Sequence, residues 1–223
     1  MIESLLPPSV RSAETFGDVR PARLFPEEEA LVARAVPKRR REFATVRACA
    51  REALGRLGVP AVPILPGPRG APGWPAGVVG SMTHCDGYRA AAVAGHRDCA
   101  AIGVDAEPHR PLPDGVLEAV SVPPERSRIV RLTAEHPAVR WDRLLFSAKE
   151  SVYKAWFPMT GRPLGFEDAD IDFDPRSRRF TARLLVPGHV LRDGRRVEGF
   201  EGRWLAGAEL VLTAVALRAS AAV

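Results

Sequence analysis

The chain has 223 residues, of which 46% are hydrophobic and 26% charged, a balance that excludes a disordered or fibrous protein. With 19 Gly and 21 Pro it is richer in turn-forming residues than an average domain. The formal net charge of +5 predicts attraction to phosphates, nucleic acid, anionic lipid or an acidic protein, without choosing among them.

Two helices and a small sheet are predicted in the first half of the chain. Residues 26–36 begin with Pro and three Glu, which is typical of a short helix. In residues 38–57 apolar side chains recur at spacings of three and four, which predicts an amphipathic helix that ends at Gly58. Pro and Gly are so dense in residues 60–77 that a long surface loop is expected. Three strands should follow, over 78–84, 87–95 and 99–107.

The second half repeats this order of elements. One or two short helices are expected over 114–132, around Pro123 and Pro124. Residues 139–157 predict a long helix that is stopped by Pro158 and Gly161. Four further strands are predicted, over 169–174, 179–186, 197–206 and 208–217. The pattern predicts an α+β protein with two similar halves, residues 1–112 and 113–223.

Cysteine usage and hydropathy bear on the cellular setting. Cys49, Cys85 and Cys99 are an odd number without a CxxC pair, which argues against a disulfide framework or a zinc cluster and favours a reducing compartment. The first residues lack a basic, apolar signal pattern, and no stretch approaches the ~18 apolar residues of a membrane span. A cytoplasmic protein without membrane contact is therefore expected.

Two carboxylates stand at the end of the third predicted strand. Asp105 and Glu107 are two residues apart, so the period of a strand points both to the same side. Oxygen ligands of this kind suit Mg²⁺, which often completes its coordination with substrate phosphates. Taken by itself, such a pair is more often a polar strand end in solvent.

The helix over 139–157 carries polar residues on the face opposite its apolar stripe. These are Ser147, Glu150, Ser151 and Lys154. The simpler interpretation is a solvated face with an ordinary i, i+4 ion pair, and a functional interpretation needs a second motif nearby.

Hydroxyl, imidazole and guanidinium groups offer further candidates. Ser81, Thr83 and His84 end a strand before a turn and could donate hydrogen bonds to a phosphate, although His84 could equally be an ordinary turn residue. The helix over 38–57 has a basic edge, which is most often simply a solvated face. The members of this edge are Arg39, Arg40, Arg47 and Arg51.

Four motifs, taken together and in order, resemble the 4'-phosphopantetheinyl transferases of the surfactin-synthetase type, especially the actinobacterial enzymes that serve carrier proteins. The motifs are EFATVRACAR, GSMTHCDGY, IGVDAEPH and FSAKESVYKAW. The resemblance covers about residues 26 to 217, and the ordered combination is far more specific than any one motif.

The resemblance implies a monomer of two α+β halves related by a pseudo-twofold axis, with coenzyme A and Mg²⁺ in the cleft between them. Asp105, Glu107 and Glu150 would be the metal ligands, and Glu150 and Lys154 the catalytic residues. Several relatives have a lysine where this chain has Pro66, so backbone and packing contacts are expected there. The run of arginines leaves Arg39 and Arg40 as alternatives at the 3'-phosphate. The implied contacts to coenzyme A are Arg39, Arg47, Pro66, Gly67, Pro68, Arg69, Thr83, His84, Asp105, Lys149, Glu150 and Lys154.

The implied reaction transfers the 4'-phosphopantetheine arm of coenzyme A to a serine of an apo acyl or peptidyl carrier protein and releases adenosine 3',5'-bisphosphate. Lys154 would stabilise the leaving phosphate, and Glu150 would accept the serine proton directly or through a metal-bound water. The carrier should be acidic, given the +5 charge.

Two other functions are possible on the sequence: a nucleic-acid binder that uses the Arg-rich helix, and a Mg²⁺-dependent phosphohydrolase. The first leaves the three carboxylates without a purpose, and low aromatic content also disfavours it.

Overall fold

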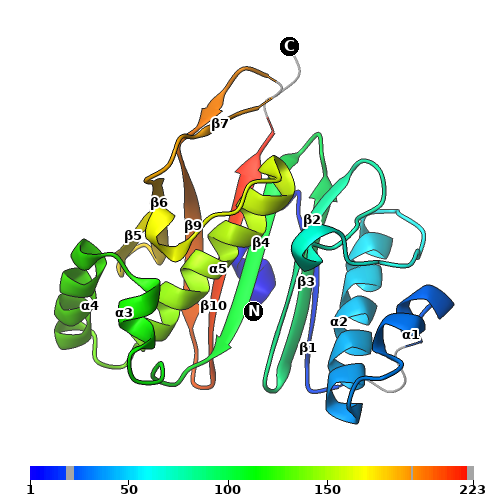
Figure 1. The fold of residues 1–223 in the computed structure, drawn as a ribbon, viewed down its shortest axis with the longest axis horizontal. Coiled ribbons are helices and arrows are strands. Elements are labelled where there is room, and N and C mark those ends of the chain that lie inside the picture. The colour runs from blue at the N-terminus through cyan, green and yellow to red at the C-terminus, as the bar shows by residue number, and fades with distance from the viewer. Residues whose placement is uncertain (19–22, 192, 220–223) are drawn as a thin grey trace.

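Two antiparallel sheets stand side by side in the protein (Figure 1). The structure is a computed structural model and describes residues 1–18, 23–191 and 193–219. The first sheet has the strand order β1-β3-β2, and the second has the order β4-β10-β9-β6-β5. A separate two-stranded ribbon, β7-β8, projects from the second sheet. The strands are β1 Arg11–Phe16, β2 Val78–Cys85, β3 Tyr88–Gly95, β4 Cys99–Pro108, β5 Ala169–Asp174, β6 Arg179–Leu184, β7 His189–Val190, β8 Arg196–Val197, β9 Gly199–Ala206 and β10 Leu210–Arg218.

One long helix packs on each sheet, α2 on the first and α5 on the second (Figure 1). This arrangement confirms the α+β class. Within the described ranges, no helix has both the length and the hydrophobicity needed to cross a membrane. The helices are α1 Pro26–Val32, α2 Pro37–Arg56, α3 Val116–Val120, α4 Pro123–Glu135 and α5 Trp141–Thr160, with 3-10 turns η1 Ile2–Leu5, η2 Pro68–Gly70 and η3 Phe166–Asp168.

Three local features differ from the sequence-based prediction. Strand β1 was not expected, because its six residues lack an apolar run and only pairing with β3 makes them a strand. The short helix ends at Val32 rather than at residue 36, and Pro37 starts α2 as its first residue. Pro158 does not stop α5, which continues to Thr160 and ends at Gly161 in the left-handed conformation.

The two sheets do not divide at residue 112. Strand β4 precedes that position in the chain, yet it pairs with β10 and so belongs to the five-stranded sheet. Strands β2 and β4 meet at the boundary between the sheets. There, side-chain hydroxyls take the place of backbone ladder bonds: the N–H of Val104 donates to Ser81 Oγ, and the N–H of Ala106 donates to Thr83 Oγ1, both at 3.1 Å. We call this boundary the seam.

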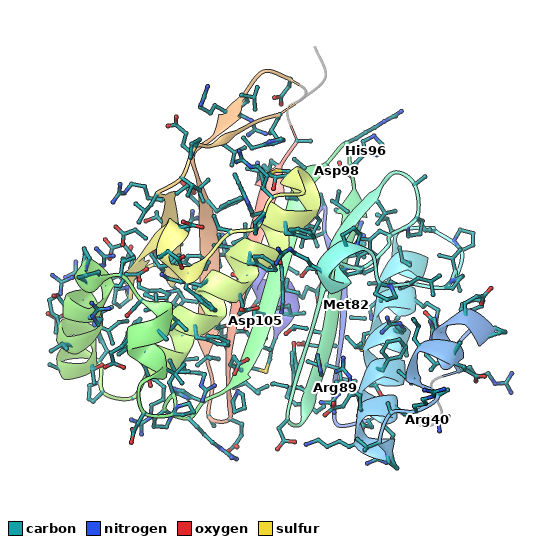
Figure 2. All side chains as sticks on the ribbon, in the orientation of Figure 1. Arg40, Met82, Arg89, His96, Asp98 and Asp105 are labelled. Carbon is teal, nitrogen blue, oxygen red and sulfur yellow. The ribbon has the colours of Figure 1, made fainter. Side chains whose placement is uncertain are left out.

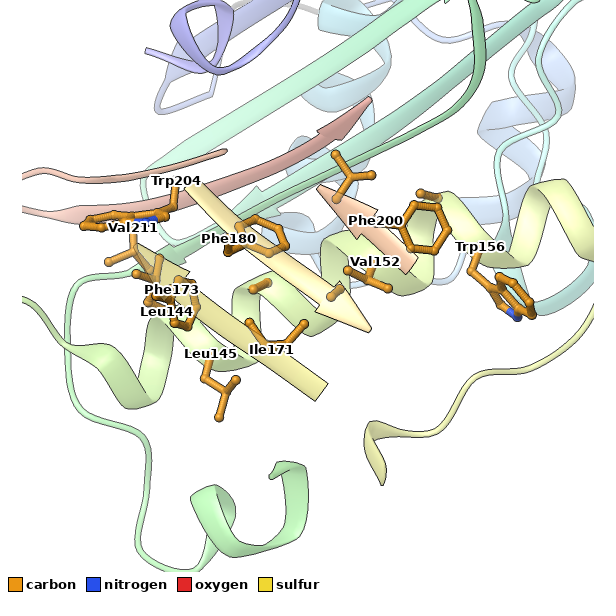
Figure 3. Close-up of a cluster of buried hydrophobic side chains, with 14 of the residues drawn as sticks. Leu144, Leu145, Val152, Trp156, Ile171, Phe173, Phe180, Phe200, Trp204 and Val211 are labelled. Atoms are coloured by element: carbon orange, nitrogen blue, oxygen red, sulfur yellow. The ribbon is translucent and has the colours of Figure 1, made fainter. Parts of the chain in front are cut away.

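The largest hydrophobic core lies between α5 and the five-stranded sheet. Figure 3 shows the aromatic side chains of this core around residues of α5. Phe173 packs between Phe180 and Trp204, with ring centroids 5.9 and 6.3 Å away. A second core on the seam joins η1 to both sheets, and a third lies beneath α2. The long helices are thus fixed to their sheets by tight apolar packing.

The two serines on the polar face of helix α5 are buried rather than solvated. Ser147 and Ser151 are fully buried, and Ser147 Oγ lies 2.9 Å from Thr213 Oγ1 of β10. Gly103 of β4 permits this close approach: a Cβ there would fall far inside contact distance of the Ser151 carbonyl and 2.8 Å from the Ala155 nitrogen. Small residues on both elements therefore set the depth at which α5 lies on β4.

Replacing Gly103 by Ala should test this packing. The added methyl group meets helix backbone that cannot move aside, so we expect the free energy of unfolding to fall by about 1–3 kcal/mol. In contrast, Gly55→Ala in α2 meets nothing within 4 Å and should raise stability by up to ~1 kcal/mol. Urea denaturation of both variants measures the difference, and a Gly103→Ala protein as stable as the wild type would contradict the tight contact.

Candidate active site

A cavity of about 600 Å³ opens between the two halves. Residues of α1, α2, the loop around Pro66, β2 and α5 line it. Its wall is largely apolar, which suits a small organic ligand, and a few cationic side chains provide polar contacts. The predicted contact residues that line the cavity are Arg39, Arg47, Pro66, Arg69, His84, Glu150 and Lys154.

The cavity also has an apolar wall that the sequence analysis missed. Tyr153 and Phe157 are one turn apart on α5 and stack with centroids 5.8 Å apart. Leu31, Phe43 and Met82 line the cavity from α1, α2 and β2. The i, i+4 spacing of Tyr153 and Phe157 was a usable signal, because it places both rings on the same side of α5 as Glu150.

Arg39 and Arg40 differ in their position relative to the cavity. Arg39 lines the cavity and its Nη1 lies 2.8 Å from Nε2 of His84. Arg40 lies on the outer side of α2, away from the seam where Met82 and Asp105 are found (Figure 2). Desolvation by the cavity walls lowers the pKa of His84, and the charge of Arg39 lowers it further. His84 is therefore an imidazole held beside a permanent cation.

Asp105 does not line the cavity, although the family resemblance implies a contact with coenzyme A, and it is only 4% exposed. Its Oδ1 accepts hydrogen bonds from Lys154 Nζ at 2.6 Å and from the hydroxyl of Thr83 at 3.3 Å. Its Oδ2 is buried and has no hydrogen-bond partner among the described residues. Thr83 is predicted to contact a phosphate, and in the structure its hydroxyl donates to Asp105 across the seam.

Glu107 and Glu150, the other two predicted metal ligands, have pKa values that the charge of Asp105 raises. Burial raises the pKa of Glu107, and the charge of Asp105 raises it further. Arg143 lowers the same pKa, because its Nη1 lies 3.0 Å from Glu107 Oε2. Burial also raises the pKa of Glu150, which Lys154 lowers and Asp105 raises. In the part of the chain that the structure describes, no three acidic, His or Cys side chains are grouped so that they could hold a metal ion. Lys154 and Arg143 instead balance the charge of Asp105 and Glu107.

Lys149 does not line the cavity, although the family resemblance implies a contact with coenzyme A. Its ammonium group is buried, lies 2.8 Å from Glu125 Oε2 of α4, and donates to the carbonyl of Ala169 at 3.0 Å. Adjacent helical residues point about 100° apart, so Lys149 and Glu150 do not share a face. Gly67 and Pro68 also lie outside the lining: Pro68 begins the exposed turn η2, and Gly67 is the N-cap residue before it.

Comparisons with known proteins identify the family of the chain. The family model described as 4'-phosphopantetheinyl transferase N-terminal domain matches residues 27–94, and that of the 4'-phosphopantetheinyl transferase superfamily matches residues 101–200. The chain is 61% identical to 4'-phosphopantetheinyl transferase Svp of Streptomyces mobaraensis over 99% of its own length and 91% of that protein. The chain belongs to the 4'-phosphopantetheinyl transferase family. It is therefore an enzyme that transfers the 4'-phosphopantetheine group of coenzyme A to carrier proteins.

Two further relatives of this transferase match over nearly their whole length. The 4'-phosphopantetheinyl transferase Npt of Nocardia iowensis is 51% identical over 97% of the chain and 99% of that protein. The 4'-phosphopantetheinyl transferase PptT of Mycobacterium tuberculosis is 50% identical over 97% of the chain and 98% of that protein. The comparisons thus confirm the 4'-phosphopantetheinyl transferase family that the four motifs indicated.

The seam of the transferase can be tested at Thr83. In Thr83→Val the buried N–H of Ala106 loses its acceptor, so we expect the free energy of unfolding to fall by about 1–3 kcal/mol. Thr83→Ser keeps the hydroxyl and should recover most of the loss. Thr181→Val, on the exposed face of β6, is the matched control and should change stability by no more than ~0.5 kcal/mol. Equal stability of Thr83→Val and Thr181→Val in urea denaturation would contradict a structural role for this bond.

Proposed function

We propose that the cavity between the halves binds coenzyme A and that Mg²⁺-dependent transfer takes place at its inner end, beside Asp105, Glu150 and Lys154. The observation that carries the proposal is that two groups of cations line one cavity: Arg39 and Arg47 from α2, and Lys154 from α5. Coenzyme A has a 3'-phosphate and a pyrophosphate on either side of its nucleoside. We assign the arginines to the 3'-phosphate and Lys154 to the pyrophosphate.

The acidic side chains have the chemistry that Mg²⁺ requires. Asp105, Glu107 and Glu150 supply hard carboxylate oxygens, and Asp105 Oδ2 is a buried acceptor without a partner among the described residues. As they stand in the described residues these three side chains are not grouped around one point, and we propose that they would come together on the ion when it binds with coenzyme A. When bound, Mg²⁺ would neutralise charge on the pyrophosphate and so favour departure of the nucleotide.

The protein's own groups then position the substrate and move one proton. Lys154, held at 2.6 Å by Asp105, would stabilise the negative charge that develops on the leaving phosphate. Glu150 would accept the proton of the carrier serine at its carboxylate, and its raised pKa makes it a stronger base than an exposed glutamate. The serine oxygen forms a bond to the β-phosphorus of coenzyme A, and adenosine 3',5'-bisphosphate leaves.

We further propose that the enzyme is a cytoplasmic monomer of the surfactin-synthetase type and that its partners are apo acyl and peptidyl carrier proteins. The net charge of +5 supports an acidic partner, and association should weaken at high salt. The three cysteines are free thiols, which is compatible with a reducing compartment. A phosphohydrolase using the same carboxylates is the alternative that the following experiments exclude or support.

Glu150→Gln tests the proposed base. Gln keeps the shape of the side chain but cannot accept the serine proton, so we expect transfer to slow by about 10²–10⁴-fold while coenzyme A still binds. The measurement is the mass of an apo carrier protein incubated with coenzyme A and Mg²⁺, together with calorimetric binding of coenzyme A. Glu135→Gln, at the exposed end of α4, should transfer at the wild-type rate. If Glu150→Gln transfers at an unchanged rate at saturating substrate, Glu150 is not the base. If coenzyme A is hydrolysed without a gain in carrier mass, the phosphohydrolase alternative is favoured.

Metal removal and Asp105→Asn test the proposed Mg²⁺ site. A chelator should stop the gain in carrier mass, and added Mg²⁺ should restore it in the wild type. In Asp105→Asn one charged oxygen ligand is lost, so we expect transfer to fall to background at the same Mg²⁺ concentration. Asp114→Asn, in the exposed segment before α3, serves as control. Full activity of Asp105→Asn, or transfer that persists in the chelator, would contradict the metal site.

A further inference from the structure

A buried cluster of three charged residues lies behind the cavity. Glu28 of α1 is fully buried, and its two carboxylate oxygens accept hydrogen bonds from Arg51 Nη1 at 3.2 and 3.0 Å. Arg47 Nε lies 3.5 Å from the same carboxylate. The N–H groups of Phe25 and Ile64 also donate to Glu28, at 3.0 and 2.9 Å. One carboxylate thus connects α1, α2 and the loop that borders the cavity.

The cluster has a net charge of +1, and only one of its members faces the cavity. The side chains of Arg47, Arg51 and Glu28 are 7%, 13% and 0% exposed, so solvent screens their charges poorly. Arg47 lines the cavity, whereas Arg51 and Glu28 lie behind it. The pKa of Arg47 is lowered to about 10: burial lowers it most, Glu28 raises it, and Arg51 and Arg39 lower it. Arg47 is therefore still charged at neutral pH, and it interacts electrostatically with both Glu28 and Arg51.

The distances show how the negative charge of Glu28 is shared. Arg51 makes two close contacts to the carboxylate, while Arg47 makes one longer contact with Nε and uses that same Nε to donate to the carbonyl of Ile64 at 3.1 Å. The guanidinium of Arg47 also packs 3.2 Å from the centre of the Phe43 ring, which fixes its orientation. Arg51 thus neutralises most of Glu28, and the charge of Arg47 stays available to a ligand.

We infer that Arg51, a positioning residue that does not touch the cavity, sets the preference of this enzyme for coenzyme A over a ligand without the 3'-phosphate. The inference rests on the proposed function, in which Arg39 and Arg47 receive that phosphate. Without Arg51, the buried carboxylate of Glu28 pairs with Arg47 and cancels its charge. The phosphate then meets a neutral pair instead of a free cation, while contacts to the rest of the ligand are unaffected.

Charge counting predicts opposite effects for the two buried partners. In Arg51→Gln the cluster becomes neutral, and calorimetric affinity for coenzyme A should fall about tenfold while that for 3'-dephospho-coenzyme A stays unchanged. In Glu28→Gln the cluster has a charge of +2, and the preference for coenzyme A should equal or exceed that of the wild type. In the double variant Glu28→Gln, Arg51→Gln the net charge is again +1, so the preference should return. Arg34→Gln, an exposed arginine after α1, loses the same charge and should leave the preference unchanged.

These outcomes separate the inference from simple damage to the fold. If the cluster served only to hold the fold, both single variants would lose affinity for both ligands and the double variant would not recover. That result, or an unchanged preference in Arg51→Gln, overturns the inference. If Arg51→Gln does not fold, as judged by its circular dichroism melting curve, Arg51→Met removes the same charge with a long apolar side chain and takes its place in the comparison.

Transfer to a carrier protein distinguishes failure of the inference from failure of the proposed function. Arg51→Gln should still add the phosphopantetheine mass to the carrier when coenzyme A is saturating. If the wild type transfers the group but binds coenzyme A and 3'-dephospho-coenzyme A equally, the inference fails and the transfer reaction stands. If the wild type adds no mass to any carrier, the proposed function fails.

Discussion

Two hydroxyl groups join the halves of this transferase where a backbone ladder would otherwise be needed. Ser81 and Thr83 of β2 accept hydrogen bonds from backbone N–H groups of β4, which are buried and need an acceptor. Because the bonds come from side chains, β2 and β4 lie together without merging the two sheets. The cavity lies over this seam, and Thr83 also donates to Asp105, so one contact both joins the halves and orients a carboxylate of the site.

Helix α5 determines which chemical groups meet at the seam. Gly103 and the buried serines let it lie close to β4, and the charged residues along the same helix then pair with the acidic end of that strand. Lys154 contacts Asp105, and Arg143 contacts Glu107. These two cations compensate the negative charge of the two carboxylates. The residues that hold the fold at this point are also those assigned to the chemistry.

The opposite side of the cavity uses a different arrangement of charge. There the cations outnumber the carboxylates, and the excess faces the ligand through Arg47, with Arg39 beside it. At the seam the carboxylates are in excess near Asp105 and Glu150. The charge of the cavity therefore changes from positive near Arg47 to negative near Asp105 and Glu150. This suits a ligand that has a phosphate at one end and, at the other, a phosphate group that binds together with a metal ion.

The sequence by itself determined the long helices, most of the strands, the α+β class and, through four ordered motifs, the family. Helical and strand periodicities are local, and a motif such as FSAKESVYKAW is read without knowing its neighbours. Only the tertiary structure decided that β1 is a strand, that β4 joins the second sheet, that Lys149 turns to Glu125, and that Thr83 serves Asp105. Each of these depends on contacts between residues far apart in the chain, where pairing and the depth of burial override local preference.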